Sequence, residues 1–399
     1  MPAWADSAVG VHAPGAHPVV DAARRLVPKV EAAAGWIEAN RRLPDALADR
    51  LTEAGLNHLY LPASAGGPEV DPLSAMTAIE VLAAADGSAA WCAHVSSANS
   101  WQIATLGPGA VAAMCEPAGR PPRRFSGSNR PCGTARPVEG GYVVSGRWDF
   151  ASNCLHADWY CGACLVLDGG ADEGGGRRTR AVFLPIADGA ILDTWDVAGL
   201  RGTGSNDFVA DEVFVPAERV SAGRHLAAQS GPLYHRRLSM VVNWALTAGV
   251  ALGLARGALD AFGDMASAGT AGAELPLRER APVQLTVGRA EARLQAARVY
   301  CHTSLAEAWE ATVAGADDAE LDRLIPPARL AIVHALHEAV EVVNPLFHAG
   351  GTRSIFAAHR LERCFRDAHV ALQHGAGSPA HFEAGGRLTL GLPARAPLW

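Results

Sequence analysis

An aromatic side chain, a small side chain and a hydroxyl follow one another at Phe150, Ala151 and Ser152. Apolar runs typical of strands precede and follow these three residues, which therefore interrupt a strand pattern. A segment that only had to fill a sheet would keep alternating β-branched residues. We therefore treat the triplet as a candidate contact with a group that needs a ring, a space and a hydroxyl in succession.

Metal binding and nicotinamide binding are not favoured by the other motifs. Cys161 and Cys164 form a C-x-x-C pair, but their surroundings are typical of a strand, where side chains three apart point to opposite faces. His334 and His337 can share one helix face, yet no third ligand is spaced to join them, so we expect them to pack. The glycine-rich run at 199–205 lacks the G-x-G-x-x-G spacing and the βαβ unit of a dinucleotide site.

Composition bounds the class of protein. The chain has 399 residues, 49% of them hydrophobic, and a formal net charge of −7. This length predicts two or three domains, and short, separated basic clusters leave no nucleic-acid footprint. The first residues lack the pattern of a secretory signal, and the most apolar stretch contains Arg256 and small residues, which favours a buried helix over a membrane span. Eight scattered cysteines are typical of reduced thiols, so we expect a cytosolic, cytoplasmic protein.

Helical and strand-like patterns divide the chain into three parts. Apolar residues at three- and four-residue spacing predict an α-helical domain over residues 1–120. A stretch rich in Pro and Gly then introduces short strand-like runs, which predict a β-barrel or β-sandwich domain over residues 121–228. Long helical segments follow, so residues 229–399 are predicted to form a four-helix bundle. The predicted fold class is therefore α+β, with the sheet between two helical domains.

Four motifs in this order resemble the acyl-CoA dehydrogenase superfamily over nearly the whole chain. The triplet at 150–152, with the ADWY that follows it, is similar to the family segment that sets an aromatic ring and a hydroxyl against a flavin. Ser128 and Asn129 lie where the family has its flavin-edge loop. The run 199–220 resembles the family's G-x-R-x-S-x-T strand pair, and 347–369 resembles its glycine and R-D-A motifs.

The resemblance gives the opening triplet a ligand. It implies that Phe150 lies against the flavin ring, that Ala151 leaves room beside it, and that the Ser152 hydroxyl lies near flavin N5. It also implies the family's fold, with a helical domain, a β domain and a helical bundle in that order.

The family's proton-abstracting glutamate is missing from this chain. Its position falls on Gly375, and glycine cannot take a proton. Glu341 is acidic and lies in the predicted bundle, but nothing in the sequence places it over a flavin. An acyl-CoA dehydrogenase with a relocated base stays open as an alternative, and so does a non-catalytic binding subunit.

A histidine after the R-D-A motif, His374, instead resembles the two-component flavin monooxygenases built on this fold. That resemblance implies reduced FMN or FAD (FMNH2 or FADH2) supplied by a separate NAD(P)H:flavin reductase. It further implies that O2 adds to the flavin as a C4a-hydroperoxide, which Ser152 helps to hold. The implied reaction is hydroxylation of a small aromatic or heteroaromatic molecule; N-oxygenation of an amine or amino sugar is the alternative.

Histidines are suited to take the proton of a phenol or indole near neutral pH. His374 is the first choice for this base. His369 lies five residues earlier on the predicted helix and points elsewhere. His369, His94 and His156 are candidates for the substrate pocket, although His94 in its apolar segment fits a packing role equally well.

The remaining cofactor contacts rest on the resemblance alone. Gly350 and Gly351 match the glycine pair that meets the neighbouring subunit's cofactor tail, but the motif's last glycine is replaced, which leaves both FMN and FAD open. Arg280 and Gln284 are placed by position only as contacts to a flavin phosphate in the next subunit; a solvated helix start is the alternative. The resemblance also implies a homotetramer.

Overall fold

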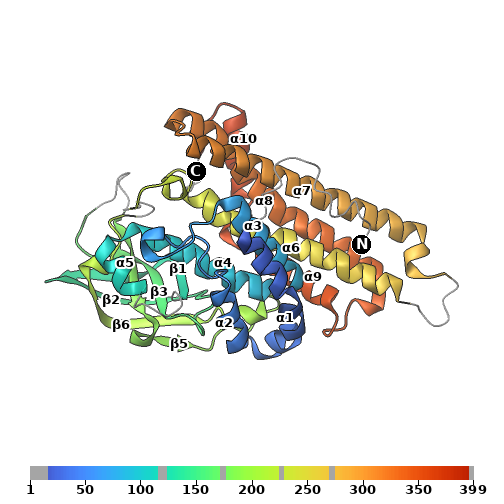
Figure 1. Cartoon of the computed structure of the whole chain (residues 1–399), viewed down its shortest axis with the longest axis horizontal. Coiled ribbons are helices and arrows are strands. Elements are labelled where there is room, and N and C mark those ends of the chain that lie inside the picture. The colour runs from blue at the N-terminus through green and yellow to red at the C-terminus, as the bar shows by residue number, and fades with distance from the viewer. Residues whose placement is uncertain (1–16, 116–123, 171–176, 224–228, 269–274, 395–399) are drawn as a thin grey trace.

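The computed structural model describes residues 17–115, 124–170, 177–223, 229–268 and 275–394. Figure 1 shows helices from the N-terminal part packed between a curved sheet and a long helical bundle. The order of helices, sheet and helices confirms the predicted α+β fold.

Five α-helices precede the sheet in the described chain. They are α1 (Pro18–Asn40), α2 (Asp45–Glu53), α3 (Pro72–Ala85), α4 (Gly87–Gln102) and α5 (Pro108–Cys115). The Asp71 carboxylate accepts from the first backbone N–H groups of α3, and Asp86 does the same for α4. Because Asp86 is the single residue between α3 and α4, it ends one helix and starts the next, which fixes the direction of α4 toward the sheet.

The middle of the chain forms one six-stranded sheet in the order β4-β3-β1-β2-β6-β5. Its strands are β1 (Phe125–Val138), β2 (Gly141–Trp148), β3 (Trp159–Val166), β4 (Thr179–Pro185), β5 (Ala190–Leu192) and β6 (Asp207–Pro216). The pair β1 and β3 is parallel and the other pairs are antiparallel. Gly140 has φ 77° in the tight turn between β1 and β2, the conformation that glycine adopts most easily.

The sheet folds back on itself around three aromatic side chains. Tyr160 on β3 stacks on Phe208 on β6 with ring centroids 4.2 Å apart, although β1 and β2 separate these strands in the sheet. The Trp148 indole lies beside both rings, and its Nε1 donates to Ala163 O at 2.9 Å. A Cβ atom at Gly133 would lie 2.1 Å from the Trp148 ring, so this glycine makes room for the indole. Strands that are not neighbours can meet in this way only if the sheet curls.

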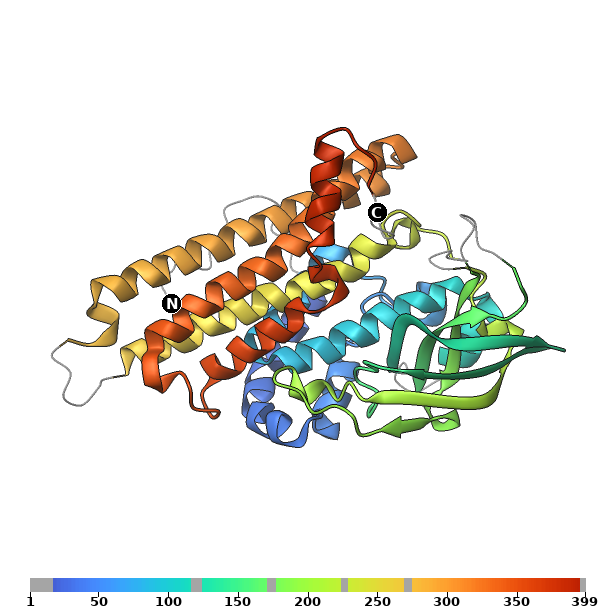
Figure 2. The same ribbon diagram turned by 180° about the vertical axis from the view of Figure 1, so that it is seen from behind.

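The helices after the sheet form the bundle. They are α6 (Ser239–Ser267), α7 (Ala281–Val313), α8 (Asp318–Gly350), α9 (Arg360–Leu372) and α10 (Ala380–Thr389). Figure 2 shows α6, α7 and α8 side by side, with α9 running along the bundle toward the sheet side. Helices α6 and α8 are long and apolar enough to cross a membrane, but 89% of the apolar window of α6 and 56% of that of α8 are buried inside the protein. Core helices pass the same test.

A stripe of glycines on α6 brings the N-terminal helices close to the bundle. Gly249, Gly253 and Gly257 recur every four residues and therefore share one helix face. A Cβ atom at these positions would lie 2.6, 2.3 and 2.7 Å from backbone carbonyl oxygens of α3. The close approach of α3 to α6 thus depends on these glycines, and it sets α4 beside α6.

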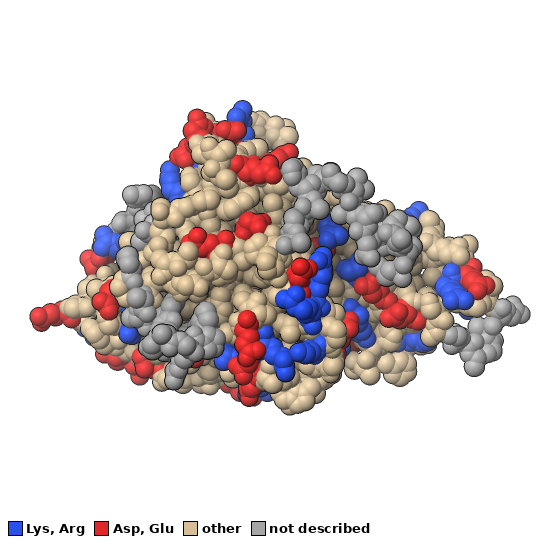
Figure 3. Space-filling view, viewed as in Figure 1, with Lys and Arg blue, Asp and Glu red and all other residues tan. Residues whose placement is uncertain are grey.

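The positions of Cys161 and Cys164 and the distribution of surface charge can be compared with the sequence patterns. Cys161 packs with Phe125 and Cys164 packs with Trp148, in two different apolar clusters, which confirms that the two cysteines lie on opposite faces of β3. Figure 3 shows acidic and basic side chains interspersed on the face that it draws, with no extended field of one sign.

Candidate active site

The predicted triplet forms a tight turn directly after β2. Phe150 has φ 57°, in the left-handed region that is uncommon for an aromatic residue. Its ring is 54% exposed, with the Arg130 guanidinium 5.9 Å and the Trp195 ring 6.1 Å from its centroid. Ala151 and Ser152 are buried. The turn therefore presents a ring near the surface and a hydroxyl in the interior.

Hydrogen bonds tie this turn to the glycine-rich segment 200–206 and, through it, to α9. Ala151 N donates to Asn206 O at 3.0 Å. At the other end of the segment, Leu200 N donates to the Asp367 carboxylate at 2.6 Å. Burial, followed by the nearby carboxylate of the α4 cap, raises the pKa of Asp367 to about 7. The segment thus links the turn after β2 to the helix that leads to His374.

Ser152 begins a chain of three buried hydroxyls. Its Oγ accepts from Trp91 Nε1 at 3.2 Å and lies 2.6 Å from Ser205 Oγ. Ser205 Oγ in turn lies 2.6 Å from Thr203 Oγ1, which donates to Leu200 O at 2.9 Å. An indole N–H at one end and a carbonyl oxygen at the other enclose the chain.

Three aromatic side chains meet on the α4 side of this chain. Trp91 and His94 are three residues apart on α4 and share one helix face, with ring centroids 5.2 Å apart. His374, in the turn after α9, lies with its ring centroid 5.5 Å from that of Trp91 and 6.4 Å from that of His94. All three contacts are edge-to-face. The indole therefore touches His374 with its ring and Ser152 with its N–H, which joins the two predicted catalytic residues.

The His374 imidazole is half-buried and neutral. Burial lowers its pKa to about 4. Its Nδ1 accepts a hydrogen bond from Ala376 N at 3.2 Å. A neutral imidazole that accepts at Nδ1 carries its proton on Nε2. In this geometry the imidazole presents a hydrogen-bond donor at Nε2.

His94 offers a second neutral imidazole. Burial, together with the neighbouring His374, lowers its pKa to about 3. Its Nε2 lies 3.4 Å from Thr247 Oγ1 on α6, while its Nδ1 is buried with no hydrogen-bond partner among the described residues. Buried polar atoms are usually hydrogen-bonded, so an orphan Nδ1 in this cluster fits a site that receives a polar ligand.

These residues fit a flavin and a small aromatic substrate. Ser152 Oγ makes two hydrogen bonds within the protein and has the capacity for one more. Edge-to-face rings at Trp91, His94 and His374 supply the apolar and aromatic lining that small-molecule sites favour. The donor set contains hydroxyl, indole and imidazole groups, and none of its members is acidic.

The other predicted pocket histidines lie in different surroundings. His156 Nδ1 is 3.4 Å from the Asp45 carboxylate at the start of α2, and burial lowers its pKa to about 4. His369 Nε2 is 2.9 Å from Asn344 Oδ1 on α8. Neither makes one of the ring contacts that join Trp91, His94 and His374 in the described chain.

Ser128 and Asn129 lie on β1 at a break in its pairing. Pairing with β3 stops at Ser128 and resumes at Gly133. Asn129 and Pro131 fall inside the break and are exposed, and proline has no N–H to offer a neighbouring strand. The break lies beside the turn at Phe150, whose ring centroid is 5.9 Å from the Arg130 guanidinium, and the sequence predicts the flavin edge here.

The four residues predicted to meet a neighbouring subunit's flavin lie far from Ser152 within one chain. Arg280 and Gln284 begin α7, and Gly350 and Gly351 end α8, at the end of the bundle away from the sheet (Figure 1). Arg280 donates to Leu275 O and Gln284 to Arg278 O in the present arrangement. The structure therefore places all four at one end of the bundle, away from the candidate site of the same chain.

The surroundings of Glu341 do not favour it as the base of an acyl-CoA dehydrogenase. Glu341 is more than half exposed, with its carboxylate 3.9 Å from Arg293. Gly375, at the family's glutamate position, directly follows His374, and its carbonyl is 3.0 Å from His381 Nε2.

Three residues of the site, Trp91, Ser205 and Thr203, are not among the residues predicted from the sequence. The sequence holds one signal for Trp91, because its three-residue spacing from His94 on a helix places both on one face. Ser205 lies in the glycine-rich motif that was recognised, but its partner Ser152 is 53 residues away, and only the folded chain joins them.

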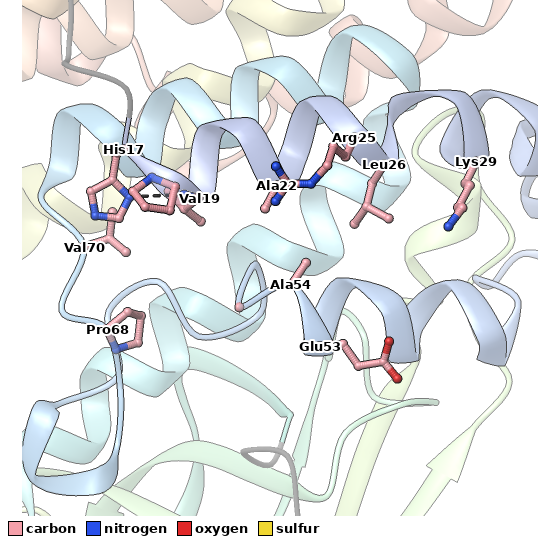
Figure 4. A pocket seen from close by; sticks show the side chains of 12 residues that line it. His17, Val19, Ala22, Arg25, Leu26, Lys29, Glu53, Ala54, Pro68 and Val70 are labelled. Carbon is pink, nitrogen blue, oxygen red and sulfur yellow. Dashed lines mark hydrogen bonds between the residues drawn. The ribbon is translucent and has the colours of Figure 1, made fainter.

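A groove of about 530 Å³ lies elsewhere, between α1, the end of α2 and the segment before α3 (Figure 4). Arg25, Lys29 and Glu53 project into it. None of the predicted site residues lines it, and its charged lining differs from the aromatic cluster around His374.

The chain is similar to known proteins over most of its length. Residues 16–113 match the family model "Acyl-CoA dehydrogenase, N-terminal domain" and residues 245–379 match "Acyl-CoA dehydrogenase, C-terminal domain". The chain is 30% identical over 366 residues to the flavin-dependent monooxygenase, oxygenase subunit HsaA, of Rhodococcus jostii, covering 89% of this chain and 93% of that protein. It is 30% identical over 358 residues to the oxygenase component of the FADH(2)-dependent resorcinol hydroxylase of a Rhizobium strain, covering 84% and 85%. The crystal structure of 3-HSA hydroxylase from Rhodococcus sp. RHA1 superposes with a TM-score of 0.85 at 27% identity, covering 96% of this chain and 100% of that one.

Proposed function

Because the chain belongs to the acyl-CoA dehydrogenase superfamily, in its branch of flavin-dependent monooxygenase oxygenase subunits, we propose that it hydroxylates a small phenol. The enzyme is an oxidoreductase that uses reduced flavin and O2. The observation that carries the choice of a phenol is the half-buried, neutral His374, whose proton is fixed on Nε2 by the hydrogen bond that Nδ1 accepts. A phenol oxygen can accept that proton as a hydrogen bond, whereas an indole N–H cannot.

Bound reduced flavin supplies the activation of O2, and the chain supplies position, dryness and hydrogen bonds. Phe150 is proposed to cover part of the flavin ring, with Ala151 beside it and Ser152 near N5. Ser128 and Asn129 border the ring edge at the break in β1. The buried surroundings of Ser152 exclude water, which protects reactive species from hydrolysis and leakage.

His374 is proposed to hold the phenol oxygen during oxygen transfer. The Nε2–H bond to that oxygen lowers the pKa of the bound phenol, so that the phenol proton leaves to solvent. The resulting phenolate is the nucleophile, and its negative charge moves from the oxygen into the ring as the new C–O bond forms. Full proton transfer to His374 is disfavoured, because a group with a pKa of about 4 is a weak acceptor for the proton of a phenol, whose pKa is about 10. His94 lines the same pocket and offers its orphan Nδ1 to the substrate. His156 and His369 are proposed only as outer pocket residues.

The assembly and the partner follow from the same proposal. A separate NAD(P)H:flavin reductase provides the reduced flavin. A homotetramer would bring Arg280, Gln284, Gly350 and Gly351 of one subunit to the flavin phosphate of the next, where the exposed start of α7 fits an anion. Sedimentation of a flavin-loaded monomer would contradict this arrangement.

We also propose a cytoplasmic location, and recovery of the chain from a membrane fraction would contradict it.

Turnover with a phenol panel tests the function. The protein, a generic flavin reductase, NADH, and FMN or FAD are incubated with simple phenols, dihydroxybenzenes and, as the matched contrast, indoles of similar size. The expected result is a phenol product heavier by one oxygen atom. Hydrogen peroxide alone across the whole panel, or turnover of the indoles in preference to every phenol, would contradict the proposal.

A further inference from the structure

We propose that the hydroxyl chain Ser152–Ser205–Thr203 makes the site prefer reduced over oxidised flavin by turning Ser152 into a hydrogen-bond acceptor. This inference rests on the proposed function, because it takes Ser152 to lie at flavin N5. It concerns two residues, Ser205 and Thr203, that position the Ser152 proton without being assigned any contact with the flavin.

The two ends of the chain fix its direction. The Trp91 indole N–H can only donate, and the Leu200 carbonyl can only accept. Each hydroxyl between them has one proton. All four hydrogen bonds, from Trp91 to Leu200, are made together only when Ser152 donates to Ser205, Ser205 to Thr203, and Thr203 to Leu200 O.

In this direction the Ser152 proton is already used. What Ser152 still offers is a lone pair, which accepts a hydrogen bond. Reduced flavin carries a proton on N5 and can donate to that lone pair. Oxidised flavin has only a lone pair at N5, so the two acceptors would face each other.

Binding of oxidised flavin with a hydrogen bond at N5 requires the chain to reverse. Ser152 then donates to N5, Ser205 to Ser152 and Thr203 to Ser205, and the bond from Thr203 to Leu200 O is lost. Leu200 O keeps its hydrogen bonds from Thr203 N at 3.1 Å and Trp195 Nε1 at 3.2 Å, so the reversed chain has one hydrogen bond fewer and leaves no orphan carbonyl. One net hydrogen bond corresponds to about a 2- to 13-fold difference in binding constant.

Substitutions at Thr203 distinguish a lost preference for reduced flavin from a general loss of folding or flavin binding. Val at position 203 keeps the shape of Thr203 but removes the link to Leu200 O, so that Ser205 and Ser152 can point either way with equal numbers of hydrogen bonds. Thr203→Ser keeps the hydroxyl and serves as the matched control. Ser205→Ala releases the Ser152 proton directly and provides a second variant if Thr203→Val does not fold.

The measurement is the ratio of dissociation constants for oxidised and reduced FMN, and likewise for FAD, determined anaerobically by titration. We expect the wild type and Thr203→Ser to favour reduced flavin, and the ratio to fall by about 2- to 13-fold in Thr203→Val and Ser205→Ala. A tenfold fall equals a shift of about 30 mV in the potential of the bound two-electron couple.

The outcomes distinguish this inference from the proposed function. A wild type that binds neither form of either flavin would overturn both. A wild type that binds reduced flavin without preference, or a ratio that stays unchanged in Thr203→Val and Ser205→Ala, would overturn the inference alone.

Discussion

Replacement of His374 by Gln and by Ala tests whether this residue donates a hydrogen bond or takes a proton. Gln carries an amide N–H at a reach similar to that of Nε2 but cannot act as a base near neutral pH. If His374 donates, His374→Gln should keep most of the activity. His374→Ala should lose the bond to the charged oxygen, worth about 1.5 to 3 kcal/mol, which is roughly a 10- to 150-fold drop in kcat/KM.

The assay is product formation from a phenol at saturating reduced flavin, compared with the dissociation constant for reduced flavin as a control for folding of the site. We expect flavin binding to change little in either variant. The pH profile adds a second test: because burial holds the pKa of His374 near 4, kcat/KM of the wild type should show no ionisation of this residue between about pH 6 and 8. Equal losses in Gln and Ala, with a wild-type profile that rises through a pKa near 6.5, would refute the donor role and restore the base.

Further predictions concern the Ser152 hydroxyl, the His374 imidazole and the packing at Gly133. Ser152→Ala should raise the hydrogen peroxide released per NADH consumed, because the contact at N5 is lost; unchanged coupling of NADH use to product would refute its role. Between pH 7 and pH 5, the free energy of unfolding should fall by about 2 kcal/mol more in the wild type than in His374→Gln. The reason is that the unfolded histidine takes up a proton below a pKa of about 6.5, whereas the folded one, with a pKa of about 4, does not. Parallel pH dependences of the two proteins in chemical denaturation would contradict this. Gly133→Ala should destabilise the protein by about 1 to 3 kcal/mol, because its Cβ would lie 2.1 Å from the Trp148 ring. Gly263→Ala on α6 is the control: nothing lies within 4 Å of its Cβ, so it should be neutral or stabilising by up to about 1 kcal/mol. Equal melting temperatures of the two variants would refute the packing argument.

The architecture could be predicted because its signals are local. The Asp71-Pro72 start of α3, the three- and four-residue spacing of the helices and the turn at Gly140 each depend on neighbouring residues only. The opposite faces of Cys161 and Cys164 follow from the strand period alone. The glycine stripe on α6 was equally visible in the sequence, at four-residue spacing, but only the packed helices show that it receives α3.

The candidate site could be predicted only in part, because its chemistry depends on burial and on distant partners. The sequence identified Ser152 and His374 but not that the Trp91 indole connects them. It identified His374 as the first choice for the base, but not that burial lowers its pKa to about 4 or that the Ala376 N–H selects its tautomer. Neither effect has a sequence signature, since both require the folded environment.

The central claim is that the chain would hold reduced flavin beside Ser152 and a phenol at His374, so that one atom of O2 enters the phenol. The most direct measurement is mass spectrometry of the product formed under isotopically heavy O2, with the protein, a flavin reductase and the best phenol of the panel. The account predicts one heavy oxygen atom in the product. A product whose new oxygen comes from water, or an acyl thioester that is dehydrogenated under the same conditions while the phenol is untouched, would contradict it.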